Sequence, residues 1–131
     1  MMMDETILLN NGIDVNHGLE LLGDMDMYNE TLDDFLTESA TRIPNIINYY
    51  NQQDWVNYEI LVHAQKSDSK YLGFMTLAEM SYNHEMAAKA QPVDVNYIVN
   101  NINPLINEAN RVVAVVKQYL GKWLYGIKWI S

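Results

Sequence analysis

A histidine followed closely by two lysines is the strongest chemical signal in this sequence. The segment that begins at His63 reads His-Ala-Gln-Lys-Ser-Asp-Ser-Lys-Tyr-Leu-Gly. On a helix, residues three or four positions apart are neighbours on one face, so Lys66 lies beside His63. Ser67 and Lys70 continue the same strip. The spacing therefore predicts an imidazole flanked by two ammonium groups.

Cations beside an imidazole favour the receipt of an anionic group over metal binding, because ammonium groups repel a divalent cation. Phosphoryl is the group that fits best. A neutral imidazole nitrogen can attack phosphorus, and Lys66 can stabilise the charge that develops on the oxygens. The small side chains of Ser67 and Ser69, with Lys70 beside them, suit the close approach of a partner protein. We expect His63 to accept phosphoryl and these three residues to dock the partner.

Helices must position this strip. Apolar residues recur at spacings of three and four, and capping residues such as Asp54 and Gly73 separate the runs. The predicted helices cover approximately 14–23, 24–50, 54–72, 77–88 and 95–120. We expect kinks at Pro44 and Pro104, or a break at the latter. The fold class is all-α, as an antiparallel four-helix bundle with a short additional N-terminal helix.

The 131 residues suffice for one domain. We expect a flexible leader over 1–11, the helical bundle over 12–120, and an amphipathic C-terminal extension over 121–131 that packs on the bundle. The extension holds Trp123 and Trp129 but too few lysines for firm membrane attachment.

Charge and composition disfavour several classes of partner. Seventeen acidic residues against 8 basic ones give a net charge of −9, which repels nucleic acid and anionic membranes. There is no cysteine, acids stand where an export signal needs bases, and no apolar run is long enough to span a membrane. We expect a monomer in the cytoplasm that binds neither nucleic acid nor membrane.

The residues His63, Lys66, Ser67, Ser69 and Gly73 match the motif of histidine-containing phosphotransfer domains, and the chain resembles that family. The likeness covers roughly 12–120. It extends to the flanking residues Ile13-Asp14, Gly18-Leu19, Gly23-Asp24, Tyr28, Phe35 and Asp54-Trp55.

The resemblance implies a carrier in a multistep phosphorelay. His63 would take phosphoryl from the phospho-aspartate of one response-regulator receiver domain and pass it to another, with Lys66 next to the phosphoryl oxygens. Such domains have no kinase activity of their own, and the sequence has no nucleotide-binding motif. Receiver domains are the implied partners, and a hybrid sensor histidine kinase is a further candidate. No cofactor is expected on this chain, because Mg²⁺ belongs to the receiver.

The symmetry of a helical hairpin adds a carboxylate to the predicted site. If the chain bends at Gly73 and Phe74, residues equally far from position 74 face each other, which pairs His63 with Glu85. A carboxylate that accepts the proton of one imidazole nitrogen fixes the tautomer and leaves the other nitrogen free to attack. Similar domains often place Gln or Glu there.

Two residues depart from the motif. Gln65 stands at an inward position that is usually apolar, and Asp68 stands where Ser or Thr is common and adds a negative charge near the lysines. They motivate an alternative, a degenerate adaptor that binds receivers without being phosphorylated.

Two further interpretations concern the histidines. His63, His84 and Glu85 together suggest a metal site in the bundle, although the chain lacks the Glu-x-x-His pair that such sites use. His84 lies on an apolar stripe and is expected to be a packed core residue. His17 is expected to be a surface residue.

Overall fold

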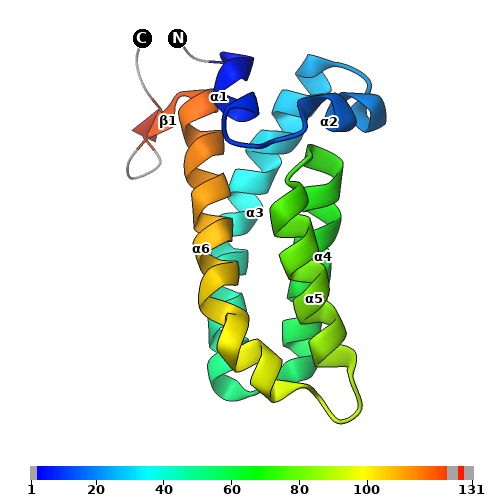
Figure 1. Ribbon diagram of the computed structural model, residues 1–131. Coiled ribbons are helices and arrows are strands. Elements are labelled where there is room, and N and C mark those ends of the chain that lie inside the picture. The colour runs from blue at the N-terminus through cyan, green and yellow to red at the C-terminus, as the bar shows by residue number, and fades with distance from the viewer. Residues whose placement is uncertain (1–2, 124–126, 129–131) are drawn as a thin grey trace.

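The described part of the chain is all-α, as the helical periodicity predicts (Figure 1). The computed structural model describes residues 3–123 and 127–128. The helices within it are α1 (Glu5–Leu9), α2 (Val15–Leu22), α3 (Met25–Gln52), α4 (Trp55–Leu72), α5 (Met75–Lys89) and α6 (Val95–Leu120). After α6, the short strands β1 (Lys122–Trp123) and β2 (Ile127–Lys128) pair antiparallel.

Helix α4, which carries His63, begins and ends at capping residues. The Asp54 carboxylate accepts a hydrogen bond from the backbone N–H of Asn57 at 3.2 Å. Gly73 follows the helix with φ of 84°, a left-handed conformation that glycine adopts without strain. A Cβ atom at Gly73 would overlap the carbonyl oxygen of Asp14. Only glycine therefore allows the start of α2 to lie so close to the turn between α4 and α5.

The four longest helices surround one core. Helix α4 packs beside α3 and α5, and α6 packs beside the same two helices (Figure 1). Helix α2 packs on α3 and α4, whereas α1 packs on α6. These neighbour relations are consistent with the bundle that the sequence predicts.

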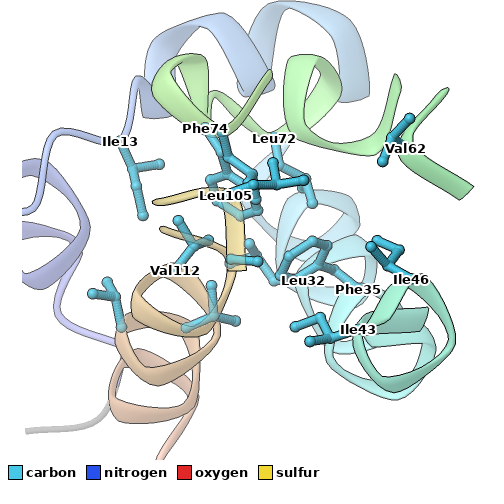
Figure 2. Close-up of a cluster of buried hydrophobic side chains, with 14 of the residues drawn as sticks. Ile13, Leu32, Phe35, Ile43, Ile46, Val62, Leu72, Phe74, Leu105 and Val112 are labelled. Carbon is cyan, nitrogen blue, oxygen red and sulfur yellow. The ribbon is translucent and has the colours of Figure 1, made fainter. Parts of the chain in front are cut away.

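One part of the core lies where the bend between α4 and α5 meets α3 and α6 (Figure 2). Leu32 and Phe35 of α3 are buried there with Leu72, Phe74 and Leu105. The rings of Phe35 and Phe74 make an edge-to-face contact, with their centroids 5.0 Å apart. This contact fixes the bend of the α4–α5 hairpin against α3.

Neither proline breaks its helix. Pro44 lies inside α3 and Pro104 lies inside α6, and both helices continue through them. Both prolines are exposed, so water can bond the carbonyl group that each ring leaves without a partner.

The N-terminal segment differs from the flexible leader that the sequence predicts over 1–11. It contains helix α1, whose first turn is capped by Asp4, and the side chain of Leu8 is completely buried. The backbone N–H of Met3 donates to the carbonyl oxygen of Tyr119 at 2.7 Å. The sequence does not reveal this helix because five residues are too few to display a helical period.

The C-terminal extension is described only in part. Over its described residues the chain forms the strand pair β1 and β2, and the side chain of Lys122 pairs with Asp33 of α3. The expected packing of Trp129 lies outside the described residues. Across the ranges that are described, no helix is long and apolar enough to cross a membrane.

Candidate functional site

His63 lies on the outer face of α4, where 54% of its side chain is exposed. Across the hairpin, Glu85 of α5 is only 2% exposed, and its Oε2 atom lies 2.6 Å from Nδ1 of His63. The symmetry of the hairpin thus predicts this pair correctly. An ionised carboxylate can only accept hydrogen bonds, so the contact requires the proton on Nδ1. In the neutral form of the ring, Nε2 of His63 therefore carries the free lone pair.

Two lysines complete the surroundings of Glu85. Nζ of Lys66 donates to Oε1 at 2.7 Å, and Nζ of Lys89 pairs with Oε2 at 3.1 Å. Burial by itself would raise the pKa of Glu85, but the hydrogen bonds from Lys66, His63 and Lys89 outweigh it and lower the pKa to about 2. Glu85 is therefore an anion at neutral pH and holds the imidazole tautomer constant.

The surroundings of Lys66 differ from those that the sequence predicts. Its ammonium group bonds the buried Glu85 and lies 5.5 Å from the centre of the Tyr82 ring, and 15% of the side chain is exposed. The sequence interpretation missed Lys89 altogether. A signal was present, because Lys89 follows Glu85 by one helical turn and must share its face.

The three residues expected to dock a partner are not equivalent. Lys70 is exposed and Ser67 is half-buried. Both line a shallow hollow of about 440 Å³ between α2 and α4, with His17 and Leu21 on its other side. Ser69 is completely buried, so the expectation that it docks a partner is wrong. It lies on the inward stripe of α4, one turn from Gln65, and faces the core.

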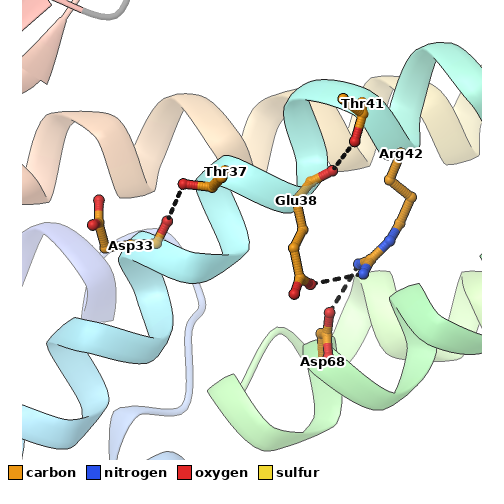
Figure 3. Close-up of polar contacts among 6 residues, drawn as sticks. All are labelled: Asp33, Thr37, Glu38, Thr41, Arg42 and Asp68. Atoms are coloured by element: carbon orange, nitrogen blue, oxygen red, sulfur yellow. Dashed lines mark hydrogen bonds and ion pairs between the residues drawn. The ribbon is translucent and has the colours of Figure 1, made fainter.

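Gln65 and Asp68 both find partners inside the molecule. The buried amide of Gln65 donates to Oγ of Ser81 at 3.0 Å, which satisfies a polar group that would otherwise be costly there. Asp68 points to α3, where its carboxylate lies 2.9 Å from the guanidinium of Arg42 (Figure 3). Neither departure from the motif disturbs the surroundings of His63.

Arg42 also pairs with Glu38 at 2.9 Å, so two carboxylates share one guanidinium (Figure 3). Burial and the nearby Asp68 raise the pKa of Glu38 despite the opposing effect of Arg42. Asp68 therefore pairs on the α3 side, and the ion pairs found among the described residues join it to Arg42 and not to the lysines around Glu85. The sequence could not reveal this cluster, because Arg42 and Asp68 belong to different helices.

His84 is a core residue, as its apolar stripe predicts. Its Nε2 lies 3.1 Å from the carbonyl oxygen of Asn101, which can only accept, so Nε2 carries the proton. The hydroxyl group of Tyr58 then donates to Nδ1 at 2.8 Å. Burial lowers the pKa of His84, against a smaller opposite effect of the bond to Asn101.

Because both nitrogens of His84 are occupied, this histidine does not join His63 and Glu85 around a common centre. Over the described part of the chain, no group of three or more histidine, aspartate or glutamate residues is arranged to hold a metal ion.

Comparisons with protein-family models, curated proteins and solved structures found no match.

Proposed function

We propose that this chain is a histidine phosphotransfer protein, a four-helix bundle that carries a phosphoryl group on His63 between the aspartates of receiver domains. One observation carries the proposal. An exposed imidazole donates its Nδ1 proton to a buried, ionised carboxylate, so its Nε2 lone pair is held toward solvent. Such an arrangement prepares a neutral nucleophile for a partner that arrives from outside.

The Nε2 lone pair of His63 attacks the phosphorus of an aspartyl phosphate on the receiver, and a nitrogen–phosphorus bond forms. The bond between phosphorus and the aspartate oxygen breaks, and its electron pair leaves on the aspartate carboxylate. The Nδ1 proton stays in place, so the ring becomes cationic and Glu85 compensates that charge. Transfer to a second receiver is the reverse of this step.

Apolar side chains around His63 supply a face on which a receiver can dock. Val56 and Ile60 precede His63 on the same side of α4 and are 74% and 54% exposed. Leu21 and Tyr71 are also exposed, beside the hollow between α2 and α4. Exposed apolar groups that gather around a reactive residue favour a protein partner. We take this partner to be a receiver domain that brings its own Mg²⁺ and meets a monomeric carrier in the cytoplasm.

Phosphotransfer from a phosphorylated receiver tests the proposal. We expect the wild-type chain to gain a phosphoryl group that is labile in acid and stable in base, as a phosphoramidate is. The variant His63→Gln should gain none while it retains the helical circular-dichroism spectrum of the wild type. Labelling of His63→Gln to the wild-type extent would show that another residue accepts the group.

The adaptor alternative depends on Gln65 and Asp68, and both side chains are satisfied within the fold by Ser81 and Arg42. Neither residue now favours it. The same experiment separates the two functions, because an adaptor would bind the phosphorylated receiver without becoming labelled.

A further inference from the structure

We infer that the two lysines on Glu85 have different tasks: Lys66 positions the carboxylate, and Lys89 is the cation that moves to the phosphoryl group. The inference rests on the proposed function of His63. It reverses the role that the motif predicts for Lys66, and it assigns a role to Lys89, which lies on α5 outside the motif.

Lys66 is held in place on several sides. It is 15% exposed, its Nζ bonds Oε1 of Glu85, and the Tyr82 ring lies beside it. Among the described residues, Lys66 is the one side chain whose hydrogen bond reaches Oε1. If Lys66 left, a buried carboxylate oxygen would lose its donor, which is strongly unfavourable. Lys66 is therefore suited to remain on Glu85 throughout the transfer.

Lys89 is held less firmly. It is 48% exposed, and its Nζ lies 3.1 Å from Oε2, the same oxygen that accepts the Nδ1 proton of His63 at 2.6 Å. If Lys89 left, Oε2 would still have a donor. The flexible four-carbon stem of lysine allows Nζ to turn from the carboxylate toward a group on the other side of the imidazole. Its bond to Glu85 raises the pKa of Lys89, so it arrives as a cation.

Charge balance favours this movement. In the nucleophilic form, in which the imidazole is neutral, the single negative charge of Glu85 faces two ammonium groups. After transfer, the ring is cationic and bonds Glu85 more strongly, while the phosphoryl oxygens bring new negative charge. Oε2 then has more cationic donors than its charge requires, whereas the phosphoryl oxygens have no cation beside them. Lys89 is the lysine that can move without leaving a buried oxygen unsatisfied.

Chemical phosphorylation tests the division of tasks without a partner protein. The full chain is treated with phosphoramidate, and ¹⁵N NMR follows the imidazole nitrogens and the two lysine Nζ signals. We expect phosphorylation of Nε2 to shift the Nζ signal of Lys89 and to leave that of Lys66 close to its starting position. A shift of Lys66 with no change at Lys89 would overturn the inference.

Matched variants give a second measurement. Lys89→Gln should keep the imidazole tautomer of the unphosphorylated wild type yet slow transfer from a receiver about tenfold or more. Lys66→Gln should weaken the Nδ1 proton signal even before phosphorylation, and Lys66→Arg should restore it. Lys117→Gln on α6 removes one charge far from the site and should transfer like the wild type. Wild-type transfer by Lys89→Gln would refute the role of Lys89.

The two proposals fail in different ways. If receivers do not label the wild type, but phosphoramidate labels Nε2 and Lys89 responds, the phosphorelay function is wrong and the lysine assignment stands. If receivers label His63 and Lys89 does not respond, only the lysine assignment is wrong.

Discussion

Three donors converge on the carboxylate of Glu85, and the state of His63 depends on them. The carboxylate is buried, and it receives the imidazole proton of His63 and the ammonium groups of Lys66 and Lys89. A buried charge that keeps all its partners is stable, whereas one that loses a partner is costly. Glu85 therefore couples the chemistry of the site to the stability of the fold.

The pH dependence of unfolding measures that coupling. The ordinary carboxyl pKa of 4.5 is lowered to about 2 in the folded chain. The contribution of Glu85 is therefore fully present above about pH 5 and is lost as the pH falls toward 2. Between about pH 5 and 2, we expect the free energy of unfolding, measured in urea, to fall by up to about 3 kcal/mol more for the wild type than for Glu85→Gln.

Glu79→Gln is the matched control, because Glu79 is an exposed carboxylate on the same helix. Its stability should follow the pH dependence of the wild type. Parallel curves for wild type and Glu85→Gln would show that Glu85 is not the coupled group.

At the scale of elements, the α4–α5 hairpin sets which residues meet. His63 and Glu85 stand equally far from position 74, so the position of the bend decides that they face each other. Gly73 makes the bend, and the backbone N–H of Asp14 donates to its carbonyl oxygen at 2.9 Å. The bend is thus bonded to the start of α2, on the side where the hollow beside Ser67 lies.

Replacement of Gly73 by alanine should be more costly than the same change at Gly12. Both glycines have positive φ, 84° and 79°, so each alanine bears a backbone cost of about 1–2 kcal/mol. A Cβ at Gly12 meets no atom within 4 Å, whereas one at Gly73 overlaps Asp14. We expect Gly73→Ala to lower the free energy of unfolding by at least about 1 kcal/mol more than Gly12→Ala, measured in urea. Equal losses would mean that α2 readily moves away from the bend.

At the scale of the whole molecule, the N-terminal segment closes one end of the core. Helix α1 lies against α6 at the end where β1 also lies (Figure 1). Leu8 is completely buried in the core cluster, and its neighbour Leu9 is 54% exposed. The fold therefore includes residues that the sequence pattern assigns to a leader.

Leu8→Ala should lower the free energy of unfolding by about 2–4 kcal/mol, because it removes buried methyl groups and leaves a cavity. Leu9→Ala is the matched control on the same helix and should change the free energy by about 0.5 kcal/mol or less. Chemical denaturation of both variants measures the difference. If the two variants were equally stable, α1 would contribute little to the core.

The sequence by itself determined the helices other than α1 and the central pair of the site. Asp54 and Gly73 mark the ends of α4 because capping depends on local backbone chemistry. The helical period placed Lys66 beside His63, and the symmetry of the hairpin placed Glu85 opposite His63. Capping, helical period and hairpin symmetry all depend on residues that are close in the sequence, so the segment from α4 to α5 is enough to apply them.

Only the tertiary structure decided the partners of the charged side chains. Lys66 reaches Glu85 because α4 and α5 pack side by side there, and Asp68 pairs with Arg42 because α3 packs on the other side of α4. Long side chains can reach several neighbours, and the choice among them depends on which helix faces which. The burial of Ser69 likewise follows from the packing of the core and not from the position of Ser69 in a motif.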